Sequence, residues 1–186
     1  MNAIIQGHEM IKDHDQQKPD PDALSLLDQG VAKAWAKLDF FRFAIAGAAS
    51  PGDSQLEEGR EVAVKLYGAL KAELVWSAPA ILMPRPAVRL MLNLLLIANE
   101  CLPRGGKVEI SGEAGEVRIV ATGARASLKS TTAVALRGET PDSEMTGYTI
   151  QQALTGLLAR QNNIELLVRE AEERIELVAR SSAFTL

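Results

Sequence analysis

Residues 37–48 read Lys-Leu-Asp-Phe-Phe-Arg-Phe-Ala-Ile-Ala-Gly-Ala and close a long stretch whose apolar residues recur at alternating steps of three and four. This spacing predicts one helix over residues 21–48 with a single apolar seam, which is typical of a helix bundle. The seam residues are Leu24, Leu27, Val31, Ala34, Leu38, Phe41, Ile45 and Ala48. The obvious partner segment, residues 4–13, is much shorter, so we expect the seam to need a further partner.

The polar stretch between these two segments contains Pro19 and Pro21 and is typical of the loop of a helical hairpin. Asp20 is suited to cap the second helix, with Pro21 at the first helical position. Residues 50–54 (Ser-Pro-Gly-Asp-Ser) end this helix and predict a linker. We therefore expect residues 1–50 to form a dimerisation domain, in which two hairpins make a four-helix bundle in a homodimer.

Beyond the linker, residues 55–186 predict a second domain of mixed helices and strands. Residues 87–102 are apolar nearly all round, which indicates a buried helix. Residues 107–111 and 116–121 alternate in polarity around two glycines and predict a strand hairpin. The other expected elements are helices over residues 55–70 and 146–160 and strands over residues 73–76, 164–168 and 174–179. The expected fold class is α+β, with the helical hairpin followed by a two-layer α/β sandwich, in which short helices cover one face of an antiparallel sheet.

Composition excludes several functional classes. The net charge of −4 argues against a broad nucleic-acid-binding surface. The single cysteine, Cys101, excludes an internal disulfide and is expected to be buried and inert. No apolar run is long enough to span a membrane, and the N-terminus lacks a signal pattern. We therefore expect a cytoplasmic protein with no membrane or nucleic-acid partner.

Three local motifs resemble those of the alphaproteobacterial histidine phosphotransferases of the ChpT type. They are residues 37–44 (Lys-Leu-Asp-Phe-Phe-Arg-Phe-Ala), 102–106 (Leu-Pro-Arg-Gly-Gly), and 147–149 (Gly-Tyr-Thr) together with 158–160 (Leu-Ala-Arg). The order and spacing of the motifs match over nearly the whole chain. The resemblance implies a histidine-kinase-like hairpin followed by a degenerate ATP-binding domain of the GHKL, or Bergerat, type.

Two departures from the kinase pattern support that degeneracy. Kinases of this superfamily carry Asn-Leu-Leu-x-Asn-Ala, whose second Asn holds magnesium, but residues 93–98 place Ile97 there. Isoleucine has no oxygen for a hard cation. Kinases also carry Asp-x-Gly-x-Gly, whereas residues 121–125 place Ala121 at the adenine-binding Asp and Arg125 at the second Gly. The resemblance therefore implies neither ATP nor a resident metal, and it disfavours an ATP-using kinase.

The phosphate acceptor of such phosphotransferases is implied to be a histidine on the first hairpin helix, in a His-Asp context followed by a proline. Residues 2–11 resemble the part just after this motif, so the acceptor is expected upstream of Met1 and the hairpin is expected to be truncated. His8 remains a fallback acceptor, although it shares a helical face with Ile4 and can equally be a core residue. His14 is expected to be a solvated loop residue.

The resemblance implies a phosphotransferase that relays phosphoryl groups from the receiver domain of a hybrid histidine kinase to response regulators, classically those of the cell cycle. Magnesium is then expected only in the partner receiver. Lys37, Asp39 and Arg42 are candidate receiver contacts, and Arg125 and Lys129 form a second candidate contact. A solvated surface is the alternative for both sets. The alternative function is a non-catalytic, receiver-binding regulator that has lost its acceptor histidine.

Overall fold

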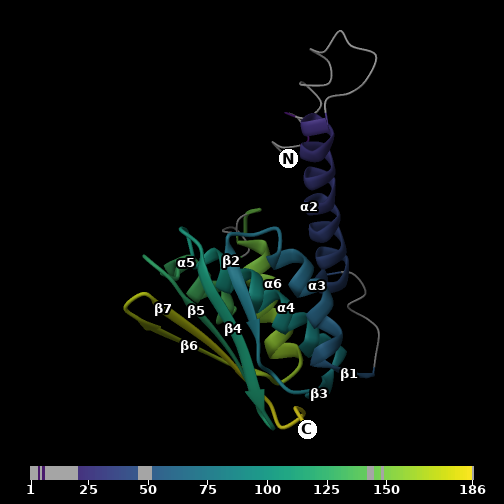
Figure 1. Ribbon diagram of the computed structural model, residues 1–186. Helices are drawn as coiled ribbons and strands as arrows, with labels where there is room; N and C mark the ends of the chain where they lie inside the picture. The colour runs from purple at the N-terminus through teal and green to yellow at the C-terminus, as the bar shows by residue number, and fades with distance from the viewer. Residues whose placement is uncertain are drawn as a thin grey trace.

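A long helix projects from a body of helices and strands (Figure 1). The computed structural model describes residues 4, 6, 21–45, 52–141, 145–147 and 149–185. The elements are α2 (Pro21–Ile45), β1 (Asp53–Gln55), the 3-10 helix η1 (Leu56–Gly59), α3 (Arg60–Tyr67), β2 (Ala72–Trp76), β3 (Leu82–Pro84), α4 (Arg85–Glu100), β4 (Gly106–Glu113), β5 (Glu116–Thr122), α5 (Ser130–Leu136), α6 (Ile150–Gln161), β6 (Glu165–Ala171) and β7 (Arg174–Arg180). The predicted α+β fold is confirmed. Within the described ranges, no helix combines the length and apolarity that crossing a membrane requires.

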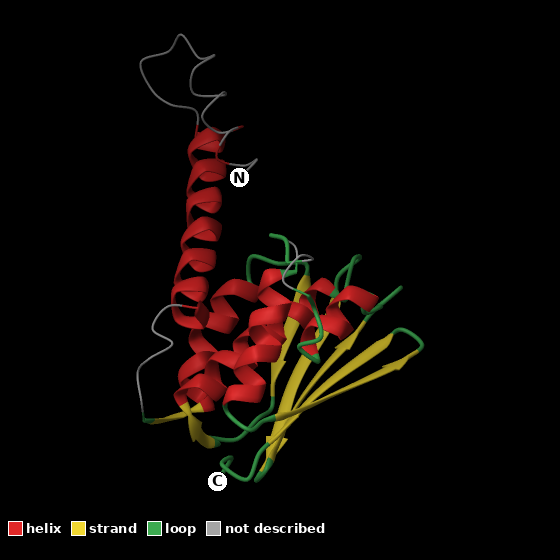
Figure 2. Ribbon diagram, turned by 180° about the vertical axis from the view of Figure 1, so that it is seen from behind, coloured by secondary structure: helices red, strands yellow, loops and turns green. Residues whose placement is uncertain are grey.

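The main sheet has five strands in the order β2-β4-β5-β7-β6, and the helices cover one of its faces (Figure 2). The predicted hairpin is formed by β4 and β5, and Gly115 in its turn has a φ of +85°. The pair β2–β4 is parallel, whereas the sequence predicted an antiparallel sheet. The parallel pair arises because α4 lies between these strands in the chain and forms the crossover that such a pair requires.

Helix α4 is the centre of the core. Ten of its sixteen residues are buried, which confirms the expectation from its apolar composition. The Tyr67 hydroxyl on α3 donates a hydrogen bond of 2.7 Å to the Leu95 carbonyl oxygen in the middle of α4. Desolvation by burial, with a smaller effect of Cys101, raises the pKa of Tyr67 above its usual range. The tyrosine therefore remains a neutral hydrogen-bond donor that fixes α3 on α4.

Two parts of the body differ from the sequence prediction. The single helix expected over residues 55–70 is divided into η1 and α3, and the Leu56 N–H at the start of η1 donates to the Ile81 carbonyl oxygen at 2.9 Å. The linker residues of β1 pair with β3 in a small antiparallel sheet. Helix α5 was not predicted, since its sequence Ser-Thr-Thr-Ala-Val-Ala-Leu is weakly helical. Packing against α6 stabilises it.

One side of helix α2 packs against the body of the protein, whereas another side is exposed. Phe40 and Ala44 are buried on the part of the helix that packs against α3 and α4. Gly30 lies against Ile4, because a Cβ atom at Gly30 would be 2.5 Å from Ile4 Cγ1. Seven large apolar side chains of α2 remain exposed: Leu24, Val31, Trp35, Leu38, Phe41, Phe43 and Ile45. Most of the predicted seam is therefore uncovered by the described part of this chain.

The fully buried side chain of Asn93 joins three helices. Its Nδ2 donates to the Ala44 carbonyl oxygen of α2 at 3.2 Å and to the Arg89 carbonyl oxygen of α4 at 2.9 Å. Its Oδ1 accepts a hydrogen bond of 3.1 Å from Gln151 Nε2 of α6. One amide thus satisfies polar groups from the end of α2, the middle of α4 and the start of α6.

Replacing Asn93 by alanine is expected to lower the free energy of unfolding by about 2–4 kcal/mol, because it leaves a cavity and buried unpaired polar groups. Asn99→Ala is the matched control on the same helix, since the Asn99 side chain makes no hydrogen bond in the described structure. That control is expected to change stability by less than about 0.5 kcal/mol. Urea denaturation measures both values, and equal effects would contradict the junction role of Asn93.

Candidate functional site

The positions that correspond to a kinase nucleotide site lie at one end of α4. Ile97 of α4 and Ala121 of β5 are both buried in the hydrophobic core. A cavity of about 10 Å³ between α4 and residues 127–132 is lined by apolar and polar residues: Ile97, Glu100, Cys101, Ser127, Leu128, Lys129 and Thr132. Ile97 and Ala121 thus belong to the apolar core, and only a small cavity adjoins Ile97.

Arg125 occupies a glycine-like position in the loop after β5. Its φ is +62°, in the left-handed region that non-glycine residues rarely adopt. A turn closes around it, because the Ala126 N–H donates to the Gly123 carbonyl oxygen at 2.9 Å. The backbone keeps the conformation that suits the second Gly of Asp-x-Gly-x-Gly, whereas the side chain adds an exposed cation.

The predicted contact residues fall into two separate groups. Lys37, Asp39 and Arg42 are exposed on α2, and Arg125 and Lys129 are exposed between β5 and α5. In the described structure none of them has an ion-pair partner. Helix α2 packs on α3 and α4, whereas α5 packs on α6, so the two groups lie at opposite ends of the helical layer (Figure 1). The structure does not bring them together.

A shallow groove between α2 and α3 was not predicted. It has a volume of about 320 Å³, a floor of small residues that includes Ala36 and Gly68, and two lysines, Lys33 and Lys65. Both lysines are exposed. The sequence carried only a weak signal for this groove, the run of alanines and lysines on α2. Lys33 and Lys65 line the same groove only because α2 and α3 pack against each other.

Cys101 at the end of α4 is buried, as predicted. Desolvation by burial raises the pKa of its thiol to about 12, with smaller contributions from the charges of Glu100 and Glu170. A thiol with this pKa is protonated at neutral pH and is a poor nucleophile. This residue therefore contributes packing rather than chemistry.

The face of the sheet away from the helices carries an ion-pair network. Arg118 of β5 pairs with Glu116 and, at 2.7 Å, with Glu176 of β7, and Arg180 pairs with Glu116 at 2.7 Å. The hydrogen bonds from Arg180 and Arg118 lower the pKa of Glu116, and the bond to Glu116 raises the pKa of Arg118. These pairs connect β5 with β7 on the solvent side, where salt bridges contribute little stability each.

The two histidines lie outside the described residues, so the structure does not test His8 or His14 as acceptors. Within the described ranges, no group of three or more His, Cys, Asp or Glu side chains is arranged to hold a metal ion. The described residues of this region therefore offer exposed cations beside an apolar core.

Comparison with known proteins gives one consistent family. Residues 56–174 match the model of the histidine phosphotransferase C-terminal domain. The chain is 34% identical over 126 residues to the protein phosphotransferase ChpT of Brucella abortus strain 2308, which covers 66% of this chain and 58% of that protein. The chain thus spans less than two thirds of the length of this curated relative.

Solved structures show the same relationship at the level of the fold. A bacterial phosphotransferase solved at 1.7 Å resolution has a TM-score of 0.84 and 26% identity, over 96% of this chain and 87% of that one. The histidine kinase AdeS of Acinetobacter baumannii has a TM-score of 0.54 and 12% identity, over 98% of this chain and 94% of that one. The second likeness shows a fold shared with a histidine kinase.

Proposed function

The chain belongs to the histidine phosphotransferase family, and we propose that it relays phosphoryl groups from the receiver domain of a hybrid histidine kinase to response regulators without using ATP. The observation that carries this proposal is a histidine-kinase-like fold in which Ile97 and Ala121, at the positions that the resemblance assigns to magnesium and adenine binding, are buried in the core. Such a protein keeps the architecture that presents a histidine to a receiver, and it has no use for a nucleotide of its own.

The filled core supports the absence of ATP binding. Pockets for small molecules usually have volumes of about 300–1,000 Å³, whereas the cavity beside Ile97 is about 10 Å³. Ile97 offers no oxygen ligand to magnesium. Ala121 offers no carboxylate to an adenine amino group, and it is buried. The small cavity and the chemistry of these two side chains support the proposal that the chain does not bind a magnesium nucleotide.

Titration of the protein with magnesium-ATP in a calorimeter is expected to release no heat beyond dilution, because the nucleotide position is occupied by side chains. An ATP-binding histidine kinase domain, titrated under the same conditions, serves as the positive control. Saturable binding in the micromolar range would contradict the proposal and would favour an active ATP-using domain.

In the transfer step, the main task of this protein is to hold the reacting histidine in position. A neutral imidazole nitrogen attacks the phosphorus of the receiver's aspartyl phosphate, so that a P–N bond forms and the acyl P–O bond breaks. The aspartate leaves as a carboxylate, and the phosphohistidine then gives its phosphoryl group to the aspartate of a second receiver. Magnesium in the receiver stabilises the phosphoryl oxygens. A rigid helix holds the imidazole in line.

The groove between α2 and α3 is the part of the structure that best fits a receiver. Its lysines, Lys33 and Lys65, suit the acidic surface around a receiver's phosphorylated aspartate, and its floor of small residues permits close approach. Lys37 is one helical turn from Lys33 on α2 and extends the same basic surface. Arg125 and Lys129 lie at the other end of the helical layer, so we assign them a secondary role at most.

The decisive experiment follows labelled phosphate from a phosphorylated receiver onto the chain as given, its His8→Ala variant, and a product extended by any in-frame codons upstream of Met1. We expect acid-labile label only on the extended product, because the resemblance places the acceptor there. In that product, Lys33→Glu and Lys65→Glu are expected to slow transfer about tenfold by opposing charge attraction. Lys107→Glu is the control and is expected to leave the rate unchanged, because Lys107 is exposed on β4 next to the buried Val108 and so lies on the face of the sheet away from the helices.

The other outcomes separate the alternatives. Label on the chain as given that disappears in His8→Ala would make His8 the acceptor. Receiver binding without label on any product would favour the non-catalytic regulator that sequesters receivers. A rate that is equally sensitive to Lys107→Glu would move the receiver contact away from the groove between α2 and α3.

The exposed side of α2 supports a homodimer. Leu24, Val31, Leu38 and Ile45 are spaced by seven residues and are all exposed, Leu38 to 62%. This is the pattern of one heptad position, and in a two-fold bundle each copy would cover the other. The homodimer also supplies the further partner that the long seam requires.

Leu38→Glu is expected to convert the protein from dimer to monomer at micromolar concentration, because two carboxylates would enter the bundle interface. Ser25→Glu, also on an exposed position of α2, is the control and is expected to remain dimeric. Light scattering after size-exclusion chromatography measures both masses. A wild-type monomer would contradict the bundle.

A further inference from the structure

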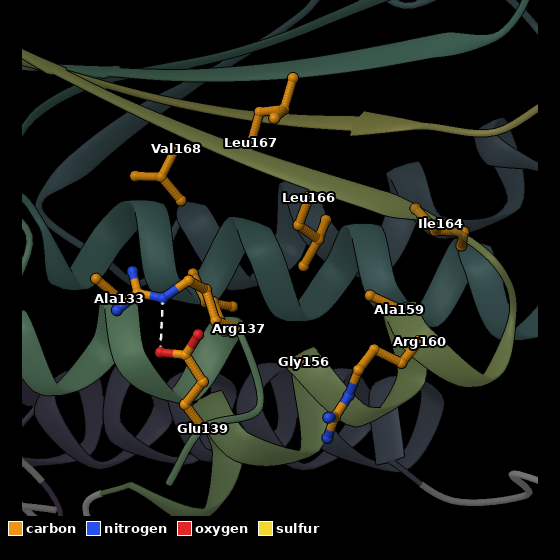
Figure 3. A pocket seen from close by; sticks show the side chains of 11 residues that line it. Ala133, Arg137, Glu139, Gly156, Ala159, Arg160, Ile164, Leu166, Leu167 and Val168 are labelled. Carbon is orange, nitrogen blue, oxygen red and sulfur yellow. Dashed lines mark hydrogen bonds and ion pairs between the residues drawn. The ribbon is translucent and has the colours of Figure 1, made fainter.

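A second groove lies between α5, α6 and β6, on the part of the fold that the proposed relay does not use. It has a volume of about 490 Å³. Figure 3 shows that Leu166 and Val168 point from β6 toward the helices, whereas Leu167 points to the opposite face. Arg137, which follows α5, and Arg160 of α6 line the helical side. The groove therefore has an apolar strand on one side and two cations on the other.

One wall of this groove is the free edge of the main sheet. Among the described strands, β6 pairs only with β7, so half of its backbone N–H and C=O groups face away from the sheet without a strand partner. Natural edge strands are usually protected by charged residues. The charged residues of β6 are Glu165 at its start and Arg169 and Glu170 near its end, whereas the segment from Leu166 to Val168 beside the groove has none.

The helical wall is held in place by close packing at Gly156. A Cβ atom at this residue would lie 2.5 Å from the carbonyl oxygen of Ala135 and 2.6 Å from that of Leu136. Because only glycine permits this approach, α5 is fixed on α6. The groove is thus bounded by a rigid pair of helices on one side and a strand of the main sheet on the other.

The charged side chains that line the groove carry a net positive charge. Arg137 forms an ion pair of 2.8 Å with Glu139, which is also visible in Figure 3. The guanidinium of Arg160 packs beside Gly138, and no carboxylate pairs with it in the described structure. The exposed side of the groove therefore carries one uncompensated positive charge, which favours an acidic occupant.

We propose that this groove binds an extended acidic peptide segment of a partner protein, which adds to β6 as a sixth strand. The main chain of the peptide pairs with the free edge of β6, and alternate apolar side chains contact Leu166 and Val168. An acidic side chain of the peptide pairs with Arg160. A helical partner would leave the strand edge unpaired, and a second copy of this chain would bring another unpaired arginine to the same place.

The test uses a fluorescent, end-capped peptide of eight residues in which valine alternates with threonine and one aspartate. Anisotropy is expected to show saturable binding that Arg160→Ala weakens about tenfold, because a charge-assisted hydrogen bond is lost. Arg104→Ala, an exposed arginine outside the groove, is the matched control and is expected to have no effect. The same peptide with asparagine in place of aspartate is expected to bind more weakly and to be insensitive to Arg160→Ala.

Hydrogen exchange distinguishes strand addition from other modes of binding. The peptide is expected to slow the exchange of alternate backbone amides in β6, and a peptide with a central proline is expected to lose both binding and this protection. Equal binding of the proline peptide, or protection confined to α5 and α6, would overturn the proposal. Absence of binding to a chain that keeps its native melting curve would also overturn it, as would self-association through β6 in the absence of peptide.

Discussion

The buried amide of Asn93 is the constraint on which the rest of the structure depends. It joins the last turn of α2, the centre of α4 and the first turn of α6 through hydrogen bonds that only a side chain with both donors and an acceptor can make. Because the site excludes water, an unsatisfied group there would be costly. The direction of α2 relative to the body, and hence the groove beside Lys33 and Lys65, follows from this junction.

The same helix that carries Asn93 also shapes the core beside β5. Four residues further along α4, Ile97 is buried in the same hydrophobic cluster as Ala121 of β5. Apolar packing therefore surrounds both residues. Arg125 in the loop after β5 has a left-handed backbone, and its side chain is exposed. The region thus combines an apolar core with a cation at its surface.

Much of the fold followed from local patterns. The seam of α2, the all-round apolar character of α4 and the β4–β5 hairpin each have a period or a turn residue that identifies them. The elements that were missed lack such a signal. Helix α5 contains two threonines and a valine among seven residues and depends on the close contact of Gly156 with its last carbonyl groups. The small sheet of β1 and β3 has strands of only three residues, which are too short to show alternation.

The sequence by itself determined the family, the α+β class, the loss of an oxygen ligand at Ile97 and the unpaired seam of α2, because each of these depends on residue identity or spacing within one segment. Only the tertiary structure decided that Lys33 and Lys65 line one groove, that Lys37 and Arg125 lie apart, and that β6 is an edge strand beside a second groove. These features join residues from separate elements. Their positions are set by how helices and strands pack around Asn93 and α4, and no local pattern records that packing.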